Sequence, residues 1–361
     1  MNKVQFRVVF FIFVIMFLLL TGCNNQNYEW KRKVQSIYGV EDPPCVVNDV
    51  VYVIDYFCSL FALDSQTGDT LREIEIENYH ACAFSLSKFP YCILYIKKFE
   101  NILFAIDMKE EKELWRYVFE DRVAFIPWVV DESVFVYIGK KKKDHHYVKV
   151  HYLIVLDMLT GEEKWRFEVE DKIESPPTVV DGVVYFGCWD HNLYALNVLT
   201  GEEKWRYETD SGGVVSKPAV VDGIVYFGSM DKYVYALYAQ TGKEKWRIKT
   251  MDSIYSSPAV TDGIVYIGSN DGYLYALDAQ TGKEVWKFKT GDRILSSPCV
   301  ANGVVYVGSN DSYLYAINSK TGKKLFKFNT GGPIVTPPRV ANNMVFFKSL
   351  DGYLYALRIE K

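Results

Sequence analysis

Short apolar stretches alternate with turns rich in glycine, aspartate and asparagine along most of the chain. One unit shows the pattern clearly, with strands expected at 256–260, 264–268, 273–278 and 284–289. Asp262-Gly263 is a tight-turn signal between two of these strands. In the last strand Trp286 and Phe288 alternate with charged residues, which indicates one buried face. Because no segment has a convincing helical period, the chain is predicted to be all-β.

The unit recurs about every 40 residues. Four tryptophans are separated by 40, 41 and 40 residues, and Phe326 takes the next place, 40 residues further on. Each of these five positions follows a Thr-Gly pair whose glycine lies four residues earlier. The four tryptophans are Trp165, Trp205, Trp246 and Trp286. Four short strands per repeat of this length predict the blade of a β-propeller.

Weaker copies extend the count toward both ends of the chain. The first units are expected at 49–72, 91–115 and 132–165, the third with an insertion around residues 140–151. An eighth unit begins at Asn342, but the chain ends before its tryptophan strand. Residues 29–32 resemble that missing strand, so Trp30 is expected to complete blade eight and close the ring, which removes an exposed sheet edge. We therefore predict eight four-stranded antiparallel blades, with seven blades as the alternative.

The first residues have the pattern of an export signal. Lys3 and Arg7 precede 13 residues, 8–20, without a charged or polar side chain. That stretch is too short to span a bilayer, which takes about 20 residues, and fits a signal peptide. The sequence Leu20-Thr21-Gly22-Cys23 resembles a lipobox, in which the chain is cut before a cysteine that is then lipidated. The predicted organisation is a signal peptide at 1–22, a lipidated linker at 23–28 and one propeller domain at 29–361; an ordinary secretory signal is the alternative.

Composition narrows the function classes. The 361 residues carry a formal net charge of −4 and are 49% hydrophobic, which is typical of a folded protein. A nucleic-acid-binding protein would be expected to carry a clustered basic surface, so no nucleic-acid partner is predicted. The 16% aromatic content favours strands.

The best copies of the repeat resemble a known family. Residues 276–286 follow the pattern Ala-x-Asp-x-x-Thr-Gly-x-x-x-Trp of the pyrroloquinoline-quinone-type propeller repeat, and residues 195–205 repeat it with Asn197 for the aspartate. The resemblance implies that the repeat tryptophans are structural and dock between neighbouring blades. These are Trp30, Trp115, Trp165, Trp205, Trp246 and Trp286.

Within that family the chain resembles outer-membrane assembly lipoproteins of the BamB type. The resemblance implies a non-catalytic, monomeric scaffold anchored to the cell envelope, on the periplasmic face of the outer membrane or on the cell surface, whose protein partner is a β-barrel assembly insertase. Quinone-dependent dehydrogenases share the repeat but hold their quinone on a disulfide between adjacent cysteines, and no two cysteines are adjacent here. No cofactor, metal site or catalytic residue is therefore predicted. A dehydrogenase-related protein and an extracellular ligand-binding propeller remain the alternatives.

Loop residues that depart from the consensus are the candidate partner contacts. Trp189 and His191 replace the Asn and Gly of the turn at residues 270–272, which is expected to leave an aromatic side chain exposed on the rim. Tyr255 and Arg293, in loops that enter inner strands, are further candidates.

Cysteine and histidine residues give weaker signals. Cys58 and Cys82 are expected on the same face of the ring and form the candidate disulfide, with free buried thiols as the alternative. Cys45 and Cys299 occupy equivalent positions two blades apart and are expected to be too distant to bond. Histidines at 145, 146 and 151 match no standard metal spacing, so a solvated loop is favoured there.

Overall fold

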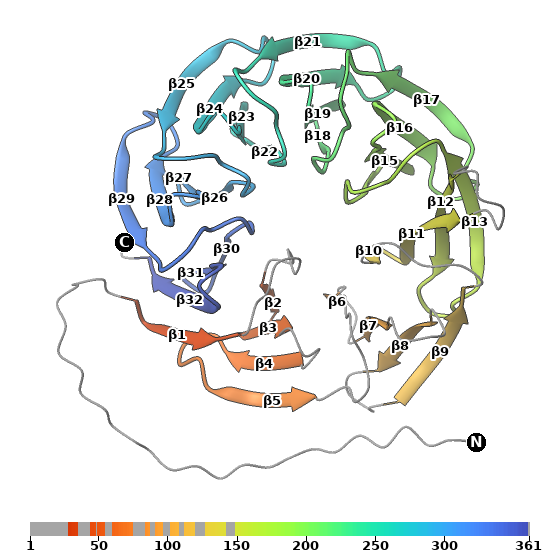
Figure 1. The fold of residues 1–361 in the computed structure, drawn as a ribbon, viewed down its shortest axis with the longest axis horizontal. Coiled ribbons are helices and arrows are strands. Elements are labelled where there is room, and N and C mark those ends of the chain that lie inside the picture. The colour runs from red at the N-terminus through yellow and green to blue at the C-terminus, as the bar shows by residue number, and fades with distance from the viewer. Residues whose placement is uncertain are drawn as a thin grey trace.

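The computed structural model describes residues 28–34, 44–47, 49–54, 60–74, 84–86, 91–96, 102–107, 112–119, 127–141 and 149–359. These residues form eight four-stranded antiparallel sheets, arranged as the blades of one closed ring (Figure 1). No helix occurs among them, and so no described helix is long and apolar enough to cross a membrane. The predicted all-β propeller with eight blades is confirmed.

Each blade runs from an inner strand at the ring centre to an outer strand at the rim. Blade 1 contains β2 (Cys45–Val47), β3 (Val50–Ile54), β4 (Leu60–Asp64) and β5 (Thr70–Ile74). Blade 2 contains β6 (Phe84–Leu86), β7 (Tyr91–Ile96), β8 (Ile102–Asp107) and β9 (Lys112–Val118). Blade 3 contains β10 (Trp128–Val130), β11 (Ser133–Lys141), β12 (Lys149–Asp157) and β13 (Glu163–Val169). Blade 4 contains β14 (Thr178–Val180), β15 (Val183–Gly187), β16 (Asn192–Asn197) and β17 (Glu203–Glu208).

The other half of the ring repeats this order. Blade 5 contains β18 (Ala219–Val221), β19 (Ile224–Gly228), β20 (Tyr233–Tyr238) and β21 (Glu244–Lys249). Blade 6 contains β22 (Ala259–Thr261), β23 (Ile264–Gly268), β24 (Tyr273–Asp278) and β25 (Glu284–Lys289). Blade 7 contains β26 (Cys299–Ala301), β27 (Val304–Gly308), β28 (Tyr313–Asn318) and β29 (Lys324–Asn329). Blade 8 contains β30 (Arg339–Ala341), β31 (Met344–Lys348), β32 (Tyr353–Arg358) and, from the other end of the chain, β1 (Trp30–Lys33).

The ring closes as the sequence predicts. Strand β1 pairs antiparallel with β32, with Trp30 opposite Ala356, so the first described strand becomes the outer strand of the last blade (Figure 1). This pairing covers the edge that β32 would otherwise present to solvent. The predicted signal peptide and Cys23 lie outside the described residues, as do Cys58, Cys82 and the histidines at 145 and 146.

Turn chemistry sets the local geometry of each blade. In blade 6 the turn between β22 and β23 places Asp262 at φ 51° and Gly263 at φ 73°, the two positive values of a type I′ hairpin turn. A bulge then interrupts the outer strand, because Trp286 pairs with Ala276 while Glu284 pairs with Leu277, leaving Val285 unpaired. The same register shift occurs in the other blades whose outer strand continues from the third.

The core lies between adjacent blades rather than inside one of them. Tyr207 of blade 4 packs edge-on against Phe227 and Tyr235 of blade 5, and those two rings stack with centroids 4.9 Å apart. Such pairs stabilise a core beyond the area they bury. The high aromatic content therefore serves inter-blade packing.

Blade 3 departs from the expectation of a solvated loop at residues 140–151. Strands β11 and β12 extend into a longer hairpin, in which Lys141 pairs with Lys149. His151 lies within β12 and is buried, and its Nδ1 is 2.5 Å from the hydroxyl of Tyr137. The expectation was wrong for His151, because the apolar alternation that places a strand residue inward continues into the insertion.

Candidate interaction surfaces

The six repeat tryptophans occupy equivalent places at blade seams. In blade 5 the indole of Trp246 lies so close to Gly282 of blade 6 that a Cβ there would come within 2.8 Å of the ring. Its Nε1 donates a hydrogen bond to the Ala279 carbonyl of the same turn, at 3.0 Å. The other tryptophan–glycine contacts are Trp30–Gly68, Trp115–Gly161, Trp165–Gly201, Trp205–Gly242 and Trp286–Gly322. Each indole thus packs on the Thr-Gly turn of the following blade.

A repeated aspartate holds the loops on one face of the ring, which we call the channel face. Oδ2 of Asp271 accepts hydrogen bonds from the Tyr275 hydroxyl at 2.7 Å and from the Met251 backbone N–H at 3.0 Å, while Oδ1 accepts from the Tyr273 N–H. Burial, and then the hydrogen bond to Asp271, raise the pKa of Tyr275. Equivalent Asp–Tyr pairs are Asp190–Tyr194, Asp231–Tyr235, Asp311–Tyr315 and Asp351–Tyr355. These carboxylates fix the loops that enter the inner strands.

Trp189 lies in the turn between β15 and β16 and is only partly exposed. Its ring packs against Gly213 of the loop that enters blade 5, and its backbone N–H donates to the Lys172 carbonyl. The Lys172 ammonium lies 6.0 Å from the ring centroid. The indole Nε1 is buried and has no hydrogen-bond partner among the described residues. The sequence predicted an exposed aromatic side chain here, whereas in the structure the Trp189 ring packs between the loop of Lys172 and the loop of Gly213.

The other candidate contacts are more accessible. His191 is exposed and has a φ of 73°, and its carbonyl accepts a hydrogen bond from the Thr209 backbone N–H. Tyr255 is 37% exposed, and Arg293 is also exposed. Burial, and then the charge of Glu174, raise the pKa of Tyr255, whereas Arg293 lowers it. Tyr255 and Arg293 thus lie in the loops that enter blades 6 and 7, on the channel face.

Sequence reasoning did not identify Met251, which is 77% exposed and belongs to the same loop as Tyr255. Met, Tyr and Arg are among the residue types that are enriched in protein interfaces. We refer to Met251, Tyr255 and Arg293 as the channel-face cluster. The only sequence signal for Met251 was an apolar residue in a loop position that the other copies fill with small or polar residues.

The ring centre carries basic side chains that the sequence analysis also missed. Lys217 is reached by solvent, yet the surrounding protein lowers its pKa by desolvation, and Arg339 adds to this shift. Arg339 is the first residue of β30. Burial raises the pKa values of the Cys45 and Cys299 thiols, and the positive charge of Arg339 partly offsets this rise. Cys45, Cys299 and Cys188 are free thiols.

A quinone cofactor does not fit the described residues. They contain no group of three His, Cys, Asp or Glu side chains able to hold a metal ion. The repeated turn aspartates that could supply carboxylate ligands bind tyrosine hydroxyls and backbone N–H groups instead.

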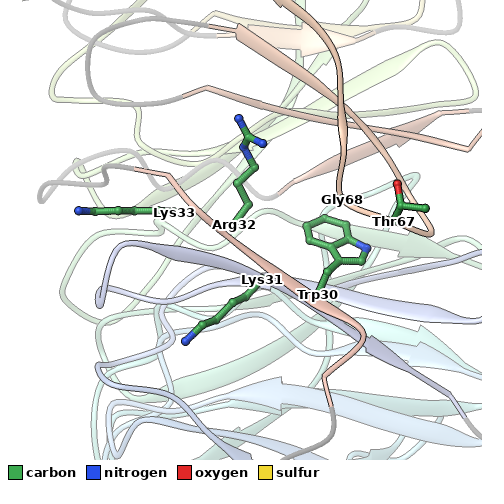
Figure 2. A pocket seen from close by; sticks show the side chains of 6 residues that line it. All are labelled: Trp30, Lys31, Arg32, Lys33, Thr67 and Gly68. Carbon is green, nitrogen blue, oxygen red and sulfur yellow. The ribbon is translucent and has the colours of Figure 1, made fainter. Parts of the chain in front are cut away.

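A shallow groove lies on the rim, at the seam of blades 8 and 1. It has a volume of about 400 Å³ and is lined by Trp30, Lys31, Arg32, Lys33, Thr67 and Gly68. Figure 2 shows the indole of Trp30 turned toward the Thr67–Gly68 turn, while Lys31 and Lys33 extend away from it. The Arg32 guanidinium lies 5.4 Å from the ring centroid of Phe61 in blade 1. Blades 2 to 6 have an aromatic or apolar residue at the position that Arg32 occupies.

Comparison with known proteins agrees with this architecture. A family model described as outer membrane protein assembly factor BamB matches residues 142–253, 211–296, 230–332 and 270–361. These overlapping matches span residues 142–361, which are 220 of the 361 residues. No curated protein sequence matches the chain.

Solved structures share the fold at low identity. BamB from Moraxella catarrhalis has a TM-score of 0.71 and 17% identity, covering 91% of this chain and 100% of that one. The computationally designed Ika8 protein has a TM-score of 0.75 and 17% identity, covering 91% and 99%. Quinohemoprotein alcohol dehydrogenase from Comamonas testosteroni has a TM-score of 0.71 and 16% identity, covering 93% and 76%. At these identities the likeness shows the fold alone, because one fold hosts many functions.

Proposed function

The chain belongs to the propeller family described as outer membrane protein assembly factor BamB, and from this premise we propose that it is a non-catalytic, lipid-anchored scaffold. In this proposal it works as a single propeller that holds protein partners at a membrane of the cell envelope, in outer-membrane protein assembly. A β-barrel assembly insertase is the partner to test first.

The lipobox-like sequence supports the anchor. Cys23 directly follows Leu20-Thr21-Gly22 at the end of an apolar stretch of signal-peptide length. Two or more acyl chains on this cysteine would hold the protein stably at a membrane. Replacement of Cys23 by serine is then expected to release the chain from the membrane fraction and to abolish its labelling by radioactive palmitate. Full retention of the variant at the membrane would contradict the anchor.

The observation that carries the scaffold role is the channel-face cluster on a rigid frame. Met251 and Tyr255 are exposed apolar and aromatic side chains in a loop that Asp271 ties to the next turn. Preformed loops bind with a smaller loss of conformational entropy. Exposed aromatic and Met side chains on such a loop are typical of a protein-binding site.

A photo-crosslinking amino acid at Tyr255 tests the partner. In cells, the full chain carrying the crosslinker at Tyr255 is expected to form a covalent adduct with the insertase, identified by mass spectrometry. The matched control places the same crosslinker at Leu199, which is 78% exposed on the opposite face of the ring, beyond the far end of β16. Equal adducts from both positions, or none from Tyr255, would contradict the proposal.

A dye-reduction assay tests the non-catalytic role. The purified protein, supplied with pyrroloquinoline quinone, calcium and a range of alcohols, is expected to reduce an electron-accepting dye no faster than buffer. Substrate-dependent reduction that saturates with added quinone would instead identify a dehydrogenase.

A further inference from the structure

The outer strands of five blades each contain one ion pair between a glutamate and a basic residue. In each, a basic residue directly after the tryptophan position forms an ion pair with a glutamate three residues earlier. The pairs are Arg116–Glu113, Arg166–Glu163, Arg206–Glu203, Arg247–Glu244 and Lys287–Glu284. Each of blades 2 to 6 therefore offsets this one cation with a glutamate, although other lysines of these strands, such as Lys245 and Lys289, have no carboxylate partner among the described residues.

Blades 7 and 8 break this pattern side by side. In β29 the basic residue is Lys327, and Lys324 stands where the glutamate should be. In β1 the basic residue is Lys31, and Tyr28 stands at the glutamate position. Among the described residues, none of Lys323, Lys324, Lys327, Lys31 and Lys33 forms an ion pair with a carboxylate. Instead, the Lys31 ammonium lies 4.6 Å from the Tyr353 ring centroid and the Lys327 ammonium 3.7 Å from the Tyr313 centroid. In these two adjacent blades no described carboxylate of the outer strand neutralises the cation that follows the tryptophan position.

Apolar side chains lie among these cations. Leu325 is the unpaired bulge residue of β29 and is 53% exposed. Phe326 takes the tryptophan position and is 41% exposed, compared with 8% for Trp246. At the bulge position blade 4 instead has Lys204, which directly follows Glu202 and Glu203. Among the described residues, blades 7 and 8 therefore combine lysines that have no carboxylate partner with two exposed apolar side chains.

The first described strand lies at the same place. Strand β1 begins at Trp30, seven residues after Cys23, and lies on the rim beside β32 (Figure 1). At about 3.5 Å per extended residue, this segment reaches no further than about 25 Å. A lipid on Cys23 would therefore hold blade 8 close to the membrane surface.

We propose that the rim of blades 7 and 8 docks edge-on onto an anionic phospholipid bilayer. The docking rim consists of Lys31, Lys33, Lys323, Lys324, Leu325, Phe326 and Lys327. The lysine ammonium groups contact headgroup phosphates, and Leu325 and Phe326 enter the interfacial layer. Unpaired lysines near a membrane anchor are the composition expected for attraction to an anionic leaflet, and one acyl anchor is strengthened by a basic patch. This inference rests on the proposed lipid anchor and adds an orientation to it, with the channel face left free at the side.

Lysine labelling on vesicles tests the orientation. The mature protein, purified from membranes in detergent, is reconstituted on vesicles of phosphatidylcholine alone or with about 30% phosphatidylglycerol, and exposed lysines are acetylated and quantified by mass spectrometry. On the anionic vesicles Lys323, Lys324 and Lys327 are expected to react about threefold more slowly than on neutral ones, and 0.5 M salt should reverse this. Lys204 on blade 4 is expected to react equally on both.

A matched pair of charge reversals separates docking from folding. Lys324→Glu places a glutamate three residues before Lys327, as in the other blades, so the fold should be retained. The protection of Lys323 and Lys327 from acetylation on anionic vesicles should nevertheless be lost. Lys204→Glu makes the same charge change on the far rim and should leave that protection intact. Equal labelling of the docking rim on both vesicle types would overturn the proposal. So would protection that persists on neutral vesicles and rises with protein density, which would indicate contact with a second copy.

The same vesicles distinguish failure of the anchor from failure of docking. Flotation with neutral vesicles reports the anchor alone, because no headgroup charge assists it. If the protein fails to float with neutral vesicles, the anchor proposal is wrong. Salt-sensitive flotation with the anionic vesicles would then still support docking, and its absence would contradict it.

Discussion

The seam between blades 5 and 6 and the seam between blades 7 and 8 differ on both sides. At the first, Trp246 is 8% exposed and packs on the glycine of the Thr-Gly turn in blade 6. At the second, Phe326 is 41% exposed, and no such turn follows β32 among the described residues. The indole is absent where its glycine partner is absent.

The seam between blades 1 and 2 follows the same rule. Arg72 occupies the tryptophan position in blade 1, and blade 2 has Lys109-Glu110 in place of its Thr-Gly pair, outside the described residues. The docking unit is therefore Trp246 with Gly282, 36 residues later, and not with the glycine four residues before it. The comparison teaches that the repeat is defined in the sequence within a blade but stabilised between blades.

Removal of the aromatic ring should have the largest effect and should differ sharply between the seams. Trp246→Ala is expected to lower the free energy of unfolding by about 3–5 kcal/mol, because it leaves a cavity and an unpartnered Ala279 carbonyl lone pair. Phe326→Ala is expected to lower it by about 1 kcal/mol, since much of that ring is already in water. Urea unfolding followed by circular dichroism measures both. Similar losses would mean that the two seams are equivalent after all.

The glycine side of the seam gives an intermediate effect. Gly282→Ala combines a strained φ of 72° with a Cβ within 2.8 Å of the Trp246 ring, so a loss of about 2–4 kcal/mol is expected. Gly263→Ala is the matched control, because its φ is 73° but nothing lies within 4 Å of the added Cβ. Its loss should be about 1 kcal/mol, from the left-handed backbone alone. If thermal unfolding shows equal losses, the indole contact does not contribute.

Charge pairing at the rim should give the smallest effect, and it should depend on pH. The Arg166 hydrogen bond holds the pKa of Glu163 below its usual value in the folded state. The unfolded chain then binds the proton more tightly, so the pair stabilises the fold above about pH 4.3 and this contribution is lost as pH falls through the lower folded pKa. Glu163→Gln is expected to cost less than about 1 kcal/mol at pH 7, since the pair is partly exposed.

Acid titration of the unfolding midpoint checks this sign. The difference between Glu163→Gln and the parent protein should shrink as the pH is lowered from 6 to 3. Lys324→Glu should instead stabilise the protein at pH 7, because it creates in blade 7 the ion pair that blade 3 already has. This gain in stability should disappear in acid. A difference for Glu163→Gln that grows with acidity would be inconsistent with a lowered pKa.

Much of the fold followed from local signals. The Asp-Gly turns, the period of about 40 residues and the tryptophan-bearing residues 29–32 predicted eight blades and the closure by β1, and the pairing of Trp30 with Ala356 confirms it. These features depend on residues close in sequence or on a repeat that recurring Thr-Gly and Trp residues make visible. Of the candidate contacts, the surroundings of Trp189 could not be predicted, because Gly213 reaches it from the next blade.

The amino-acid sequence by itself determined the strands, the turns, the number of blades and which strand closes the ring, because turn residues and alternating side chains act within a few residues of one another. Only the tertiary structure decided which glycine each tryptophan meets, that Lys217 and Arg339 share the ring centre, and that the lysine-bearing strands β29 and β1 lie in neighbouring blades. These outcomes depend on curvature, since closing eight twisted sheets into a circle brings together residues from different blades. The repeat pattern in the sequence does not say which residues of different blades come close together.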